Sequence, residues 1–383
     1  RNIAIGADAM GSGVATNASG HNIALGTEAG QDITTGTHNF LAGNRAGWDV
    51  TTGTNNIAIG NGTLDAANSA THNIALGSGA LSSATTGGRN IAIGQEAMNF
   101  GVATAASGDN IAIGYQVGYG LTSGTNNFLG GQRSGTNLTT GSNNVALGNG
   151  ALDSATTGGR NIAIGQDAMG LGVATAANGY NVSIGVEAGK SITSGTYNTL
   201  IGWQAGDALN SSLGSVVIGA GAFSAASTSR GTAIGLSALE NATGDGNTAI
   251  GSQVGQDVST GTNNTLLGTR AGNSGTNDLT TGSNNTIIGY NAAASSATVS
   301  NEITLGNSSI TRFRIPGAGI DNTSAALTGT TPSVDVGARD TYTLTTSGNT
   351  TFTFTGAPSS GQVGTFSLII TAGGTHTLTW PAS

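Results

Sequence analysis

The feature that most constrains this chain is a five-residue phrase that recurs throughout residues 1–306. The phrase opens as Asn-Ile-Ala-Ile-Gly at residues 2–6, and its terminal glycine marks 18 copies. These glycines are Gly6, Gly26, Gly43, Gly60, Gly77, Gly94, Gly114, Gly131, Gly148, Gly165, Gly185, Gly202, Gly219, Gly235, Gly251, Gly268, Gly289 and Gly306. Most are 17 residues apart, with spacings of 16, 20 and 21 elsewhere. Such a period indicates that each unit is one turn of a repetitive architecture.

The repeat unit predicts an all-β fold, a parallel β-solenoid or β-roll of about 18 coils. Its Ile-Ala-Ile segment is short and β-branched, and glycine and Thr-Thr-Gly turns bound it. No proline occurs before Pro316, so nothing interrupts a hydrogen-bonded ladder. Because a unit of this length has no room for a crossover helix, successive segments should stack directly as parallel strands. Their stacking gives a rod on the order of 80 Å long.

Alternating strand positions face opposite ways, and one of the two faces predicts an oligomer. We expect the large residues one and three positions after the asparagine, such as Ile57 and Ile59, to build the inside of each coil. The residue between them is never charged. Since one coil can cover only one face, a second chain should cover this middle position, most simply in a homotrimer of parallel subunits, intertwined or side by side. The expected subunit-contact column is Ala4, Ala24, Leu41, Ala58, Ala75, Ala92, Ala112 and Leu129.

Asparagine fills the first position of the phrase in 15 of 18 copies, the exceptions being Ser215, Gly231 and Glu302. Repeated asparagine at a fixed turn can form an amide ladder in which each side chain bonds to the next coil. The predicted ladder contains Asn2, Asn22, Asn39, Asn56, Asn73, Asn90, Asn110, Asn127, Asn144 and Asn161. An axial ion or ligand site made from the same amides is the alternative.

The period stops at Gly306, which divides the chain into a shaft at 1–306, a transition and linker at 307–335, and a module at 336–383. In the module, Tyr342 and Leu344 alternate with threonines, and so do Phe352 and Phe354. This alternation and the intervening glycine turns predict an antiparallel β-sandwich or prism-like module, which looks incomplete. Because the chain opens without methionine on a strand phrase, we also expect it to be part of a longer polypeptide.

Composition argues against several functional classes. The formal net charge is −8 with 11 Lys+Arg, and no basic stripe is present, which disfavours nucleic-acid binding. No apolar run is long enough to predict membrane insertion. The absence of cysteine excludes disulfides and thiolate metal sites. No Ser/His/Asp grouping or phosphate loop appears, so we expect no catalytic residue, no cofactor and no enzyme activity.

Two weak candidate sites remain. His21 and His38 directly precede the asparagine in neighbouring coils and could share a metal, but without a nearby carboxylate the site would be weak. We therefore expect no metal and assign this position to a solvated corner. Carboxylates also recur two positions after the glycine, at Asp8, Glu28, Glu96, Asp167 and Glu187. A glycosidase would need a facing pair of them across a groove. Arg45 is one coil from Glu28 in the same column, so surface or inter-subunit pairing is the simpler role.

The phrase Asn-Ile-Ala-Ile-Gly, followed by Ala and Thr-Thr-Gly, is similar to the repeat region of bacteriophage tail fibres. It is also similar to the β-roll head of trimeric autotransporter adhesins. Residues 344–354, Leu-Thr-Thr-Ser-Gly-Asn-Thr-Thr-Phe-Thr-Phe, and residues 378–383, Leu-Thr-Trp-Pro-Ala-Ser, resemble a β module frequent in phage tail fibre proteins.

This resemblance implies a homotrimeric tail fibre shaft that presents host-receptor-binding parts for adsorption to the cell surface. The implied location is the virion, outside the cell. The implied partners are further copies of the chain, other virion tail proteins, and a host cell-surface receptor such as a glycan. One alternative is the head of a trimeric adhesin on a bacterial surface. A tailspike-like glycan hydrolase is the third.

Overall fold

The structure is a computed structural model of the chain. It describes residues 1–12, 20–83, 86–100, 108–171, 179–225, 230–312, 324–335, 341–356 and 367–381. Within these ranges it is all-β and contains no helix. The chain divides into two compact units, Arg1–Ser309 and Ile310–Ser383. The boundary between the two units therefore follows Ser309, three residues after Gly306, where the sequence period ends.

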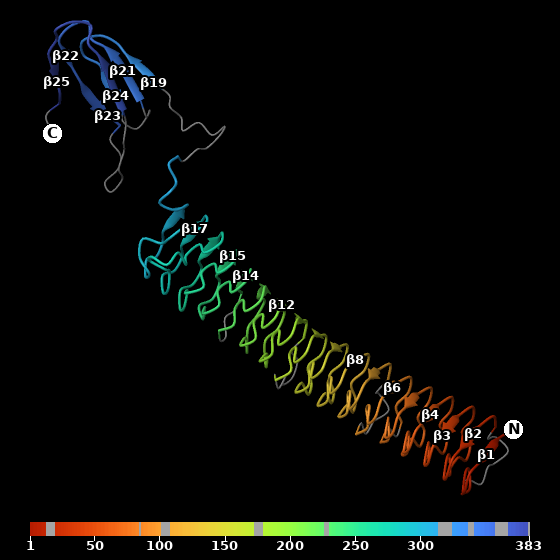
Figure 1. Cartoon of the computed structure of the whole chain (residues 1–383). Coiled ribbons are helices and arrows are strands. Elements are labelled where there is room, and N and C mark those ends of the chain that lie inside the picture. The colour runs from red at the N-terminus through yellow and green to blue at the C-terminus, as the bar shows by residue number, and fades with distance from the viewer. Residues whose placement is uncertain are drawn as a thin grey trace. The chain divides into compact units, whose positions relative to one another are not determined.

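The first unit is a parallel β-solenoid with one three-residue strand per coil, and its strands form one 18-stranded sheet. Strand pairing follows the sequence phrase, with Ile57 opposite Ile74 and Ala58 opposite Ala75. Figure 1 shows the coils following one another without a branch. The strands are β1 (Ile3–Ile5), β2 (Ile23–Leu25), β3 (Phe40–Ala42), β4 (Ile57–Ile59), β5 (Ile74–Leu76), β6 (Ile91–Ile93), β7 (Ile111–Ile113), β8 (Phe128–Gly130), β9 (Val145–Leu147), β10 (Ile162–Ile164), β11 (Val182–Ile184), β12 (Thr199–Ile201), β13 (Val216–Ile218), β14 (Thr232–Ile234), β15 (Thr248–Ile250), β16 (Thr265–Leu267), β17 (Thr286–Ile288) and β18 (Ile303–Leu305). The predicted solenoid of about 18 coils is confirmed.

The two faces of each strand are the reverse of the sequence expectation. Ala58 is completely buried inside its own coil, whereas the flanking Ile57 and Ile59 are 40% and 42% exposed. The same pattern holds at β7, where Ala112 is buried and Ile113 is 43% exposed. The middle column therefore lies in the coil interior, and the large side chains lie on the outside of the sheet.

The coil interior is narrow, and its side chains are matched in size. Leu41 fills the interior of its coil, where a Cβ on Gly47 would lie 2.7 Å from Leu41 Cδ2 and 3.2 Å from Val50 Cγ2. In the next coil, Leu64 takes the place that Gly47 has in its own, and Ala67 takes the place of Val50. A large residue at one interior position is thus compensated by a small one at another, as close packing requires.

The glycine that ends each phrase is fixed by backbone geometry and by the neighbouring coil. Gly202 has φ of +134°, a region essentially restricted to glycine. A Cβ there would lie 2.7 Å from both the carbonyl carbon and the carbonyl oxygen of Gly219 in the next coil. The coils can therefore approach to β-ladder distance only where no side chain intervenes.

The second unit is also built from parallel strands, so the predicted antiparallel module is wrong. Its strands form three small sheets, β19–β21–β24, β20–β23 and β22–β25, and every pair is parallel. Val334, Tyr342, Leu344 and Phe352 are buried at its core. The strands are β19 (Ser324–Leu327), β20 (Ser333–Asp335), β21 (Thr341–Thr345), β22 (Thr350–Thr351), β23 (Thr353–Thr355), β24 (Ser367–Thr371) and β25 (Leu378–Thr379).

The error has a simple cause. Alternation shows that one strand face is buried, but it does not give the strand direction. The glycine turn after β21 leads to β22 in a different sheet, so it turns a corner where a hairpin was expected. Two strands, β19 and β20, also fall within residues 307–335, where a linker was predicted. The part of that linker at 313–323 lies outside the described residues.

The glycine column gives a test of the coil spacing. We expect Gly202→Ala to lower the free energy of unfolding by about 3 kcal/mol or more, because strained φ and a backbone clash add together. The measurement is a urea denaturation at constant chain concentration. Gly62→Ala is the matched control, because Gly62 has φ of +61° and no described atom lies within 4 Å of its Cβ position. That variant should lose only about 1 kcal/mol, and equal losses would contradict the role given to the column.

Candidate functional site: the asparagine ladder and two exposed surfaces

The asparagine column forms the predicted amide ladder. The backbone N–H of Asn144 donates to Asn127 Oδ1 at 3.0 Å, and its Nδ2 donates to the same oxygen at 3.1 Å. The Nδ2 group also donates to the Gly158 carbonyl at 2.9 Å. Asn161 repeats the first two bonds onto Asn144 Oδ1, at 3.0 and 3.4 Å. Each amide therefore joins its own coil to its neighbours.

The bonding pattern decides between the two sequence interpretations of this column. Where asparagines follow one another, as at Asn127 and Asn144, the amide oxygen accepts two N–H groups from the next coil, and the Nδ2 group donates both to the preceding coil and to a carbonyl. Amides engaged in this way satisfy buried backbone groups that would otherwise carry a large penalty. The column is a structural ladder, which supports that prediction over an ion site.

The asparagine ladder is interrupted at the coils whose first position is not asparagine, and a buried side chain explains one of these interruptions. Ser215 still donates its backbone N–H to Asn198 Oδ1 at 2.9 Å, and its hydroxyl lies 2.8 Å from the Ser212 hydroxyl. At Gly231 a Cβ would lie 2.6 Å from Cζ of Phe223, a fully buried ring. Phe223 thus occupies the space that an asparagine side chain would need.

A substitution in the ladder should be costly. Asn144→Ala would leave the Asn161 donors and the Gly158 carbonyl without these partners, so we expect a loss of about 3 kcal/mol in the free energy of unfolding. Thermal and urea denaturation measure it. The adjacent Asn143 is exposed, so Asn143→Gly should change stability by less than about 0.5 kcal/mol. A comparable loss in both variants would show that the buried amide has no special role.

The outer face of the 18-stranded sheet is the first exposed surface. It consists of the two strand positions that flank the buried middle residue, and none of them is charged. The large side chains on it that are most exposed are Ile3, Ile5, Ile57, Ile59, Ile113, Phe128, Ile162, Ile184, Ile218, Ile250, Leu267, Ile288, Ile303 and Leu305. A contiguous apolar surface of this extent is unusual on a soluble monomer and marks an interaction site.

The predicted subunit-contact column is therefore corrected. Ala24, Leu41, Ala58, Ala75, Ala92, Ala112 and Leu129 are fully buried inside a single chain and cannot touch another one. Ala4 lies in the first strand and is exposed there. The signal that could have found the right face is size, because alanine recurs at the middle position whereas isoleucine, leucine and valine recur at the flanking positions, and a narrow coil interior favours the smaller side chain. A second signal is the series of threonines at the first strand position, which faces outward: Thr199, Thr232, Thr248, Thr265 and Thr286.

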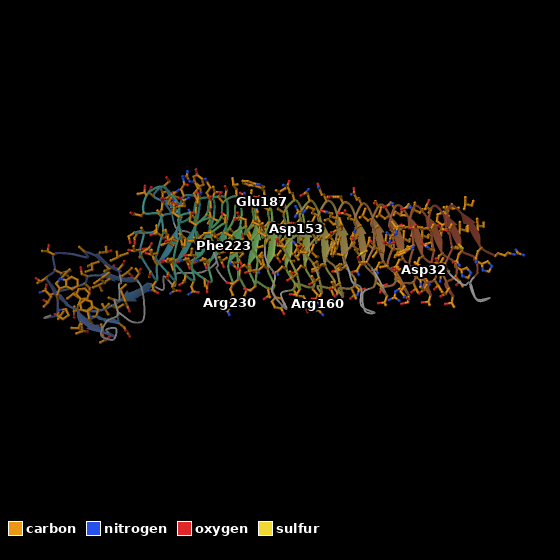
Figure 2. The ribbon with its side chains drawn as sticks, turned by 90° about the horizontal axis from the view of Figure 1, so that it is seen from below. Asp32, Asp153, Arg160, Glu187, Phe223 and Arg230 are labelled. Atoms are coloured by element: carbon orange, nitrogen blue, oxygen red, sulfur yellow. The ribbon has the colours of Figure 1, made fainter. Side chains whose placement is uncertain are left out.

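The second exposed surface is the corner column, the residue immediately before the first position of each phrase from the second phrase onward. Every described non-glycine member is left-handed, with φ between 56° and 67°. The members are His21, His38, Asn55, His72, Arg89, Asp109, Asn126, Asn143, Arg160, Tyr180, Tyr197, Gly214, Arg230, Gly246, Asn263, Asn284 and Asn301. Figure 2 shows two of them, Arg160 and Arg230, along the same edge of the solenoid. The predicted solvated corner is observed.

The candidate metal pair belongs to this column. The rings of His21 and His38 stack with centroids 5.0 Å apart and an interplanar angle of 16°. Among the described residues, no group of three or more His, Cys, Asp or Glu side chains could hold a metal. The two imidazoles therefore pack against each other, and no further ligand is brought to them within those residues.

An exposed ion pair in the corner column joins Arg89 and Asp109. Arg89 Nε donates to Asp109 Oδ1 at 2.7 Å, and Nη2 donates to Oδ2 at 2.9 Å. This bidentate hydrogen bond, together with the guanidinium charge, lowers the pKa of Asp109 below its ordinary value of 3.8. Both side chains are exposed, so salt will screen their attraction.

This pair gives a pH prediction with a defined sign. A carboxyl whose pKa is lowered by folding contributes stability above its unfolded pKa, and that contribution is lost as the pH falls through the folded pKa. We expect wild type to be slightly more stable than Asp109→Asn above about pH 5, and the two to converge at more acidic pH. Urea midpoints measured across this range test it. A stability difference between the two proteins that persists at acidic pH, or that does not decrease when salt is added, would contradict the ion-pair account.

Three of the carboxylates two positions after the glycine, Glu28, Glu96 and Glu187, contact the next coil of the same chain. Gln116 Nε2 donates to Glu96 at 2.7 Å, and Gln204 Nε2 donates to Glu187 at 2.7 Å. Lys190 Nζ lies 2.6 Å from Glu187, and this bond lowers the pKa of the Glu187 carboxyl. Arg45 lies 3.9 Å from Glu28 and 3.2 Å from Asp65. These contacts favour surface pairing along the coil stack over a facing catalytic pair.

No protein-family model matches the chain, and no curated protein matches it. In the part of the chain that the structure describes, no helix has the length and apolar character needed to cross a membrane.

Proposed function

We propose that this chain is the structural shaft of a homotrimeric phage tail fibre, which positions receptor-binding parts at the host surface. Support comes from the solenoid fold, from the sequence resemblance, and above all from the uncharged apolar face along the 18-stranded sheet. Water contact along this face is unfavourable, and burying it against another surface would remove that penalty.

Further copies of the same chain are the partners that best fit this face. The exposed side chains repeat on every coil at the ladder spacing, so an identical parallel copy presents rungs at the same spacing. A closed cyclic arrangement of three flat sheets turns every outer face inward and leaves no copy unpaired. The contact is made by Ile57, Ile59 and their equivalents, not by the buried alanines.

The proposed role is mechanical. Coil-to-coil hydrogen bonds along the backbone and the asparagine ladder favour a stiff rod, and three such rods packed together are stiffer still. A rigid trimer holds its terminal parts in a fixed relation, which raises their effective concentration at a surface bearing many receptors. No chemical step is required of the shaft.

Two adjacent residues test the assembly. Ile113→Asp places a charge on the outer face and should dissociate the oligomer while leaving the coil folded. Ala112→Asp places the charge inside the coil and should unfold it. Sedimentation equilibrium and circular dichroism together distinguish the results, because the wild type should sediment at three times the 37.2 kDa chain mass.

The outcomes separate the alternatives. A wild-type chain that is folded and sediments as a monomer would rule out the trimer. Cleavage of a surface polysaccharide by the purified chain would favour the glycan hydrolase. Labelling of intact virions by an antibody against the chain would favour the fibre, and labelling of a bacterial surface in the absence of phage would favour the adhesin head.

A further inference from the structure

The corner column contains one gap in its stack of side chains, and the gap is at Gly214. Arg160, Tyr180, Tyr197, Gly214 and Arg230 occupy five consecutive coils, each two residues before the start of its strand. Backbone hydrogen bonds hold the coils together here: Tyr180 N donates to Arg160 O at 2.8 Å, and Gly214 N to Thr196 O at 3.0 Å. Arg230 N donates to Leu213 O at 2.9 Å.

The tyrosines below the gap form an ordered stack. The rings of Tyr180 and Tyr197 lie 5.1 Å apart with an interplanar angle of 6°. The Arg160 guanidinium covers Tyr180 from the preceding coil, 5.4 Å from the ring centroid. Tyr197 is 59% exposed, and the corner position of the next coil is Gly214, which has no side chain to cover its ring. One face of Tyr197 is therefore left without a neighbour from the column.

The position beside Gly214 is open, whereas the corresponding position beside Gly246, the other glycine of this column, is filled. Among the described residues, nothing lies within 4 Å of a Cβ placed on Gly214, which has φ of +69°. At Gly246 the same construction falls 2.6 Å from Oδ1 of Asn263, so a neighbouring side chain already fills that position. Tyr197 and Arg230 are two coils apart, roughly 10 Å along the stack. One ring placed midway would lie at about the spacing at which the two tyrosines stack.

We propose that Tyr197, Gly214 and Arg230 form a binding slot for one ring of an acidic saccharide. The ring face of tyrosine is negative and attracts the C–H bonds of a pyranose face. Arg230, on the other side, offers a planar fork of donors that fits a carboxylate. This inference deepens the proposed function and rests on it, because it names the class of surface molecule that the shaft would touch.

Charge favours an acidic ligand over a neutral one. The chain carries a net charge of −8, yet both charged members of the corner column between residues 160 and 230 are arginines. Figure 2 places Arg160 and Arg230 on the same edge. They lie four coils apart, roughly 19 Å, so a polysaccharide with repeated carboxylates could reach both. The slot opens to solvent, which suits a chain that continues beyond the bound ring.

The test is isothermal titration of the wild-type assembly with a galacturonic acid tetramer and, for comparison, a neutral galactose tetramer. We expect the acidic tetramer to bind and added salt to weaken it. Gly214→Tyr fills the slot with a residue that the column accepts at Tyr180 and Tyr197, and should weaken binding at least about tenfold. Arg230→Gln should remove the preference for the acidic over the neutral tetramer.

The matched control is Gly62→Tyr, which adds the same side chain at a left-handed glycine with open space, in a coil far from the slot. It should bind within about twofold of wild type. Failure of the wild type to bind the acidic tetramer, or unchanged binding by Gly214→Tyr, would overturn the slot. Sedimentation of the same samples reports the oligomer separately, so an intact trimer that does not bind would overturn the slot and leave the shaft proposal standing.

Discussion

The structure depends on keeping each coil directly on top of the next at the spacing of a β-ladder. The glycine that ends each phrase permits the approach, because a Cβ on Gly202 would meet the backbone of Gly219. The asparagine column then fixes it, with buried amides such as Asn144 bonding to both neighbours. Close approach and amide bonding are needed together, since the ladder amides can reach one another only across a short gap. Everything else in the solenoid is arranged around that stack.

A narrow interior follows from short coils, and it decides what faces outward. The space between the strand and its return segment is filled by alanine in many coils, and in others by a larger side chain that a small neighbour accommodates, as Gly47 does for Leu41. The larger side chains are left on the outer face, where a single chain cannot cover them. The proposed trimer thus originates in the limited volume of one coil. The corner column is a separate consequence of stacking, because it aligns exposed side chains along one edge.

The repeat made the solenoid and its amide ladder predictable from sequence, because period and fixed asparagines are properties of each unit. The direction in which a side chain points was not predictable in the same way. The alternation of Ile57 and Ala58 is the same whichever of the two residues faces the coil interior. The pattern therefore allowed two strand orientations, and the predicted one, with isoleucine inside, was wrong. In the second unit, alternation around Tyr342 and Leu344 located strands correctly but said nothing of their partners. The pairing of β21 with β19 and β24 is set by contacts between segments distant in sequence.

The sequence by itself determined that this chain is an all-β stack of about 18 coils joined by an asparagine ladder. Spacing and residue type at each position are local, and they repeat. Only the tertiary structure decided which strand face is covered, that the C-terminal strands run parallel, and that Tyr197 and Arg230 frame an open position at Gly214. Those features depend on interior volume and on which coils become neighbours, and neither quantity is contained in the order of residues within one unit.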